Sequence, residues 1–218
     1  MGAPSYGWIA ANLAIWLIGA ILVPIYETDS QAQVDFIKRE TGLKLLLCNE
    51  QLNDLNGLKE AGKSILSSEL ANISNHVEPK TPAAVIFTSG TTGNPKGVTL
   101  THANFIGAVR GVINEPPPHG LLHNIGTPES RYLAFLPLSH VLALMVTHTV
   151  LSSRGQLSFC PDIANLISAL QAFRPTFLVA VPRVFRFDTV AAKENLLKKI
   201  RPIIKVSDEN LKSGYYKF

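Results

Sequence analysis

The residues of this sequence most suited to chemistry form one loop, 88–97, which combines four hydroxyl side chains, three glycines and a lysine. Glycines let a backbone turn sharply and approach a ligand closely. Hydroxyls and backbone N–H groups donate hydrogen bonds, and a lysine adds a mobile positive charge. This combination predicts a loop that binds the phosphates of a nucleotide.

The spacing of the loop excludes the two commonest nucleotide-binding loops. A Walker A loop places Gly-Lys-Ser/Thr four residues after its first glycine, whereas Pro95 is the fifth residue after Gly90 and Lys96 precedes another glycine. A dinucleotide fingerprint opens with Gly-x-Gly, but Gly90 and Gly93 lie three positions apart. The alternative is a Ser/Thr/Gly linker that joins two strands and binds no ligand. The Pro-Lys-Gly exit into an alternating strand at 98–100 disfavours it.

The loop resembles the signature loop of the adenylate-forming enzymes, the superfamily of acyl-CoA synthetases, luciferases and peptide-synthetase adenylation domains. The matching positions are Val85, the run 88–93 and Pro95-Lys96-Gly97. The resemblance implies an ATP-binding function for seven residues: Thr88, Ser89, Gly90, Thr91, Thr92, Gly93 and Lys96.

Three further segments extend the resemblance. Residues 136–140, Leu-Pro-Leu-Ser-His, are similar to a family element whose histidine lies beside the carboxylate to be activated, which implies a catalytic role for His140. The resemblance of the loop implies a catalytic role for Lys96 as well. Taken alone, His140 is more typical of a hydrogen-bonded histidine at a helix start, but its place after a predicted strand and the matching element favour the catalytic role. Residues 14–28 and 173–185 resemble the long-chain branch of the acyl-CoA synthetases. The implied substrate is therefore a long-chain fatty acid.

The resemblance implies a two-step ligation. The fatty-acid carboxylate attacks the α-phosphate of Mg²⁺-ATP, giving an acyl-adenylate and pyrophosphate, and the thiol of CoA then displaces AMP. ATP, the fatty acid and CoA are the implied partners, with Mg²⁺ as the implied metal, although the family's magnesium-binding element is not found in this sequence. In the first step the loop would steady the phosphates and stabilise the charge that develops at the α-phosphate.

The composition agrees with an α/β enzyme. The 218 residues can form one large domain or two small ones, and 46% apolar against 17% charged residues is typical of buried parallel strands. Cys48 and Cys160 are too few and too distant for a disulfide framework, which indicates a reducing compartment and a cytoplasmic location. His119 and His123 lie four apart in a Pro/Gly loop with no acidic partner, so no metal site is predicted.

The net charge of +4 does not indicate a nucleic-acid-binding protein. Residues 189–218 carry seven basic and three acidic side chains, whereas residues 1–188 carry thirteen of each sign. Without a basic face in the larger part, no nucleic-acid partner is predicted. The basic segment is typical of a solvated amphipathic helix, with an arm for an anionic surface as the alternative.

The apolar run 8–23 is not read as a signal peptide or a membrane anchor, because it is short for a span, has no basic leader and ends at Pro24. We expect a buried helix followed by a short strand. A peripheral contact with a membrane stays open, since the implied substrate is a lipid.

Helices and short apolar strands are expected to alternate along the chain, with Ser30, Thr101 and Asp162 as N-caps. The expected helices are 8–17, 31–40, 102–113, 138–153 and 162–173, and the expected strands are 21–25, 43–48, 83–88, 131–137, 156–159 and 176–181. This order predicts an α/β fold, a mainly parallel sheet with helices on both faces. The resemblance identifies it as a partial N-terminal domain of the acyl-CoA synthetase fold.

The resemblance ends near Phe185, and the family's later elements for magnesium, ribose and the catalytic lysine are not found. We therefore expect a partial AMP-binding (adenylation) domain at 1–188 and a basic helical tail, unlike the family, at 189–218. Such a chain is expected to be a truncated long-chain fatty-acid CoA ligase that is not competent by itself. The alternative is a non-catalytic nucleotide-binding or interaction module derived from the same scaffold.

Overall fold

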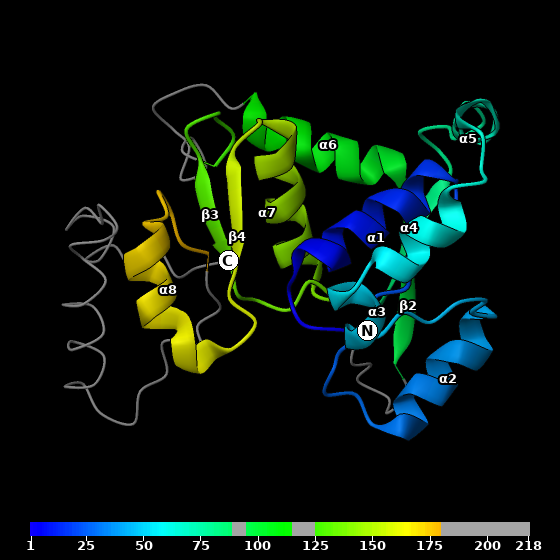
Figure 1. Cartoon of the computed structure of the whole chain (residues 1–218), viewed down its shortest axis with the longest axis horizontal. Helices are drawn as coiled ribbons and strands as arrows, with labels where there is room; N and C mark the ends of the chain where they lie inside the picture. The colour runs from blue at the N-terminus through cyan, green and yellow to red at the C-terminus, as the bar shows by residue number, and fades with distance from the viewer. Residues whose placement is uncertain (89–94, 115–124, 180–218) are drawn as a thin grey trace. The chain divides into compact units, whose positions relative to one another are not determined.

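The computed structural model describes residues 1–88, 95–114 and 125–179 (Figure 1). The chain divides into two compact units, one formed by 1–109 with 137–145 and the other by 110–136 with 146–218. Two of the three boundaries between the units fall within helices α6 (His102–Ile113) and α7 (Val141–Ser152), and the third lies between Leu136 and Pro137. The predicted basic tail, 189–218, lies outside the described residues, so its structure and the boundary at 188 stay predictions.

The first unit begins with two helices whose ends follow local sequence signals. Helix α1 (Tyr6–Leu17) starts at Ser5, and helix α2 (Gln31–Thr41) starts at Ser30. Ser30 forms a capping box with Gln33, and Gly42 ends α2 in the left-handed conformation, at φ 61°. The helices predicted at 8–17 and 31–40 are confirmed.

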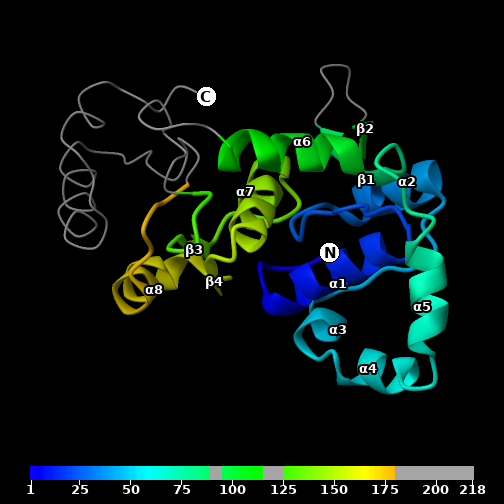
Figure 2. The ribbon, with the colours of Figure 1, turned by 90° about the horizontal axis from the view of Figure 1, so that it is seen from above.

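Three short helices lie between residues 49 and 74, where no helix or strand was assigned from the sequence: α3 (Asn49–Asn53), α4 (Asn56–Gly62) and α5 (Ser67–Ser74). Helix α1 lies beside α3 and α5 (Figure 2). A side chain at Gly7 of α1 would place its Cβ 1.6 Å from the carbonyl oxygen of Leu52, in α3. Glycine is therefore required where these two helices meet.

The sheet of the first unit is a hairpin of β1 (Pro82–Thr88) and β2 (Lys96–Thr101), which pair antiparallel. Leu22 forms an isolated parallel bridge to Ala84. The strand at 83–88 is confirmed, but this pairing differs from the mainly parallel sheet predicted. Only a short loop separates the two strands, and a connection that short closes a hairpin, whereas a parallel crossover needs a dozen or more residues.

The second unit contains a parallel pair, β3 (Arg131–Ala134) and β4 (Gln156–Phe159). Phe177 forms a further parallel bridge to Tyr132 of β3. A 3₁₀ turn (Ile163–Asn165), capped by Asp162, leads into helix α8 (Leu166–Phe173), which contacts β3. Here the parallel arrangement predicted from alternating helices and strands is confirmed.

Four predicted strands are wrong or shortened among the described residues, and one of them, predicted at 131–137, ends as β3 at Ala134. Residues 43–48 form no ladder, and two of their few backbone bonds run from Leu43 N–H to Lys38 and from the N-terminal amine of Met1 to the Leu47 carbonyl. The strands predicted at 21–25 and 176–181 are reduced to single bridges, and the second extends beyond the described residues. An apolar run indicates burial, but strand formation also needs a partner in register.

The α/β class is confirmed. Helices α6 and α7 correspond to the helices predicted at 102–113 and 138–153, with α7 starting later. None of the helices within residues 1–88, 95–114 and 125–179 has the length and apolar character needed to cross a membrane.

Candidate functional site

The predicted phosphate loop leaves β1 at Thr88 and rejoins β2 at Lys96. These two residues are cross-strand partners at the loop end of the hairpin, and the Thr88 Oγ1 donates to the Lys96 carbonyl oxygen at 3.5 Å. Both are exposed. The structure thus brings together the first and last of the predicted ATP-binding residues. The other five lie outside the described residues: Ser89, Gly90, Thr91, Thr92 and Gly93.

A bulge at Ala83 ties the hairpin to the rest of the first unit. The ladder register shifts between Pro82 and Ala84, and the Ala83 carbonyl accepts from the Leu22 N–H at 3.0 Å and from the Trp16 Nε1–H at 2.8 Å. A bulge redirects the backbone groups of the extra residue away from its partner strand. The carbonyl is therefore free to fix α1 against β1, the strand that leads into the loop.

An aromatic cluster supports the same junction. The Trp16 ring packs edge-on against His102, with 5.5 Å between the ring centroids, and tilted against Phe105, with 4.8 Å between the centroids. Both partners belong to α6. Burial lowers the pKa of His102, whose Nε2 atom is buried and has no hydrogen-bond partner within the part of the chain that the structure describes. The start of α6 carries the predicted cap, since Thr101 and Asn104 exchange hydrogen bonds. These contacts hold the end of the hairpin away from the loop, so packed elements anchor the two strands that carry the loop.

Lys96 carries a positive charge that is not paired within the described part of the chain. The ion pairs found there join other residues, Lys38–Asp35, Lys63–Glu60 and Lys80–Glu78. Next to Lys96, a Cβ at Gly97 would lie 2.9 Å from a methyl of Val85 and 3.2 Å from the Phe87 ring. Glycine is needed at position 97 because the side chains of Val85 and Phe87, on the opposite strand, pack over its backbone.

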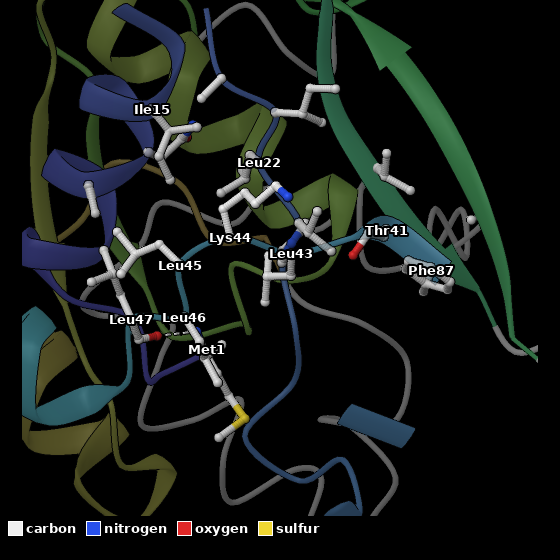
Figure 3. A pocket seen from close by; sticks show the side chains of 18 of the residues that line it. Met1, Ile15, Leu22, Thr41, Leu43, Lys44, Leu45, Leu46, Leu47 and Phe87 are labelled. Atoms are coloured by element: carbon white, nitrogen blue, oxygen red, sulfur yellow. Dashed lines mark hydrogen bonds between the residues drawn. The ribbon is translucent and has the colours of Figure 1, made fainter. Parts of the chain in front are cut away.

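A cavity of about 1020 Å³ adjoins the loop within the first unit, bordered by Pro95, Lys96 and Gly97. Its other walls come from α1, from 18–24, from 40–47 and from β1. Figure 3 shows aliphatic side chains of α1 and of the 43–47 segment on one side, with Phe87 of β1 across from them. The segment predicted as a strand at 43–48 thus forms a cavity wall instead.

His140 lies at the start of α7, where its Nδ1 accepts a hydrogen bond from the Leu142 N–H at 3.3 Å. Its side chain is exposed and is not part of the cavity lining. An accepting Nδ1 leaves the proton of a neutral imidazole on Nε2, which could donate to a carboxylate. A histidine at a helix start makes this capping contact whether or not it is catalytic. The catalytic role of His140 therefore stays a prediction.

The contacts of two residues, Trp16 and Lys44, could not be foreseen from the sequence. Trp16 was placed in a buried helix, but its hydrogen bond to β1 was not foreseen, because the indole N–H and its acceptor are 67 residues apart. Lys44 was placed in a buried strand, whereas it is exposed and lines the cavity. A charged residue inside an otherwise apolar run was the available signal for a solvent-accessible position.

The described residues contain no group of three His, Cys, Asp or Glu side chains that could hold a metal ion. Both cysteines are free thiols: Cys48 is partly exposed and Cys160 is buried. His119 and His123 lie outside the described residues.

Comparison with known proteins places these features in a family context. The profile of a family described as AMP-binding enzyme matches residues 1–209, which extends past the domain boundary predicted at 188. Long-chain-fatty-acid--CoA ligase FadD15 of Mycobacterium bovis is 33% identical over 219 residues, covering 88% of this chain and 36% of that protein. Long-chain-fatty-acid--CoA ligase 6 of Rattus norvegicus is 30% identical, covering 81% of this chain and 30% of that protein. The chain thus spans about a third of the length of these curated relatives.

Solved structures share the fold. The inhibitor-bound N-terminal domain of FACL13 from Mycobacterium tuberculosis superposes with a TM-score of 0.63 at 21% identity, covering 85% of this chain and 49% of that one. ATP-bound MatB from Rhodopseudomonas palustris superposes with a TM-score of 0.64 at 18% identity, covering 94% and 42%. At these identities the likeness concerns the fold alone.

Proposed function

Because this chain belongs to the AMP-binding enzyme family, we propose that its 88–97 loop binds the phosphates of ATP in the adenylation of a long-chain fatty acid for transfer to CoA. The observation that carries the proposal is the pairing of Thr88 with Lys96 at the loop end of the hairpin. It places a hydroxyl, and a cation that has no ion-pair partner among the described residues, at the two ends of a loop rich in hydroxyls and glycines.

The role proposed for the loop is to stabilise negative charge on the phosphates. A carboxylate oxygen of the fatty acid attacks the α-phosphorus, and the bond to the bridging oxygen of the β-phosphate breaks, so that pyrophosphate leaves with its electron pair. Lys96 and the loop hydroxyls would hold the β- and γ-phosphates and offset the charge that develops on them. In the second step the sulfur of CoA attacks the carbonyl carbon, its proton goes to a base, and AMP leaves.

His140 is proposed to orient the carboxylate. Its Nδ1 is held by the backbone at the start of α7, so the Nε2–H is the atom available to a ligand. Mg²⁺ accompanies ATP mainly through phosphate oxygens and one or two carboxylates. The described residues contain no cluster of metal-ligating side chains, so we assign no magnesium ligand to them.

The relatives named as fatty-acid–CoA ligases support the choice of acid, and the ATP named with MatB supports the nucleotide. Since the chain spans about a third of those relatives, nucleotide binding and the complete reaction are separate questions. We expect nucleotide binding from this chain, and the complete reaction is tested separately.

Nucleotide binding by the Lys96→Ala variant tests the proposal. Titration calorimetry with ATP should show at least about a tenfold loss of affinity, because hydrogen bonds to charged groups contribute about 1.5–3 kcal/mol. Lys59→Ala is the control, since Lys59 is an exposed lysine of α4 in the same unit and lies outside the cavity. Equal ATP affinity in the parent and the Lys96 variant would show that the loop does not bind phosphate.

A second measurement separates an enzyme from a binding module. Fatty-acid-dependent exchange of labelled pyrophosphate into ATP reports the first half-reaction. ATP binding without exchange agrees with the sequence prediction of a chain that binds but does not adenylate. Exchange by the 218-residue chain would show that it carries all the residues that adenylation needs.

A further inference from the structure

One side chain of α1, Trp16, contacts both strands of the hairpin at the end away from the loop. Its indole Nε1–H donates to the carbonyl oxygen of Ala83, the bulged residue near the start of β1. Its ring packs against His102 and Phe105 of α6, and His102 directly follows Thr101, the last residue of β2. Trp16 therefore contacts the chain where β1 begins and again where β2 ends.

The hydrogen bond from Trp16 restrains β1 in addition to a backbone contact. The Ala83 carbonyl also accepts from the Leu22 N–H at 3.0 Å, and an oxygen with two lone pairs can accept both bonds. Ala83 is fully buried and Phe105 is 4% exposed, whereas Trp16 is half-buried. Without the indole N–H, β1 would stay bonded to Leu22 but could tilt about that contact.

The hairpin carries its orientation from this end to the loop. Between Ala84 and Thr88 the register with β2 is continuous, without a further bulge. Ala83 and Thr88 lie about 17 Å apart along β1, at a rise of about 3.4 Å per residue. Over that length a tilt of about 3° moves the loop by about 1 Å. Charge-assisted hydrogen bonds need N···O distances of about 2.7–2.9 Å, so a shift of this size breaks them.

We propose that Trp16 is a positioning residue for the 88–97 loop. It fixes the tilt of the hairpin through Ala83 and His102, and thereby sets where the Thr88 hydroxyl and the Lys96 amine meet the phosphates of ATP. The inference rests on the proposed function, since it concerns the ATP-binding role of the same loop. By linkage, a bond that favours ATP binding is itself favoured by bound ATP, and by the same factor.

Trp16→Phe tests the role of the hydrogen bond, because it keeps an aromatic ring against α6 and removes the N–H donor. Titration calorimetry of ATP with the 218-residue chain should show about a two- to tenfold loss of affinity, the range that one net hydrogen bond contributes to an equilibrium. Equal ATP affinity in the parent and in Trp16→Phe would overturn the proposal.

Ser30→Ala is the control for a loss of stability alone. Ser30 is exposed and forms the capping box of α2, and losing such a cap lowers stability by an amount comparable to losing one hydrogen bond. Where nearly all molecules are folded, as circular dichroism verifies, lower stability does not by itself change the ATP affinity. Ser30→Ala should therefore bind ATP like the parent. An equal loss in Ser30→Ala and Trp16→Phe would overturn the proposal.

A second measurement uses the parent chain, so it does not depend on whether a variant folds. Deuterium exchange of the Trp16 indole N–H, followed by NMR, reports how often its bond to Ala83 opens. The chain contains two tryptophans, and substitution of either one assigns both indole signals. Saturating ATP should slow exchange at Trp16 by the same factor of about two to ten. Unchanged exchange with ATP bound would overturn the proposal.

The Lys96→Ala titration separates this inference from the proposed function. ATP binding that Lys96→Ala weakens and Trp16→Phe does not would refute only the positioning role of Trp16. ATP binding that Trp16→Phe weakens and Lys96→Ala does not would place the nucleotide away from the loop and refute both. Absence of ATP binding in the parent would also refute both.

Discussion

Acidification should destabilise the chain through one buried side chain, His148 of α7. This residue is 6% exposed, and burial lowers its pKa to about 4 from the ordinary value of 6.5. The charged imidazolium is disfavoured because the packed interior around it cannot hydrate it. In the unfolded chain the same side chain is hydrated and takes up its proton near pH 6.5.

The sign and size of the effect follow from these two values. Between pH 6.5 and about pH 4 the unfolded chain binds one more proton than the folded chain, so the free energy of unfolding falls as the pH falls. The contribution is complete above pH 6.5 and is lost by about pH 4. At about 1.36 kcal/mol per pH unit, this interval corresponds to about 3 kcal/mol.

The assay compares the parent with His148→Gln, which keeps polar atoms at this position but does not titrate in this range. Urea unfolding is followed by circular dichroism at steps between pH 7 and pH 4. The variant is less stable at neutral pH, but the parent should lose about 3 kcal/mol more than the variant over the interval. Since the carboxylates titrate alike in both proteins, their contribution cancels in the difference. Parallel pH profiles would refute the reasoning.

Three further predictions concern the free energy of unfolding, measured by urea titration. Tyr132→Phe should raise it by about 1 kcal/mol, because the buried hydroxyl has no hydrogen-bond partner among the described residues; a loss would show that a partner exists. Trp16→Phe should lower it by about 1 kcal/mol by removing the 2.8 Å bond to Ala83, and no change would contradict that bond's role. Gly7→Ala should lower it by about 1–3 kcal/mol through the clash with α3. Its control, Gly107→Ala, has free space in α6 and should raise it by about 0.5–1 kcal/mol.

Features set by neighbouring residues could be predicted from the sequence. Helix α2 lies between Ser30 and Gly42, as its caps predicted, and Thr101 begins α6 in the same way. These signals act over three or four residues, so the sequence contains both partners of each interaction. The strand at 83–88 could be predicted equally well, since it is apolar and ends in a loop of distinct composition.

Features that depend on distant partners could not be predicted. The run 43–48 has the composition of a buried strand, yet it forms no ladder and lines a cavity. Its composition indicates contact with apolar groups, which a strand and a cavity wall both provide. The close contact of α1 with α3 at Gly7 was also missed, because a glycine within a helix gives no sign of which backbone faces it.

Lys96 belongs to two features that the sequence treated separately. It ends the phosphate loop, and it also borders the apolar cavity. The antiparallel register explains this double position, since the partner of Thr88 must lie at the same end of the hairpin, where β1 also presents Phe87 to the cavity. A mainly parallel sheet would have placed the strand after the loop a crossover away. The hairpin therefore sets the cation proposed for the phosphates at the border of the apolar cavity.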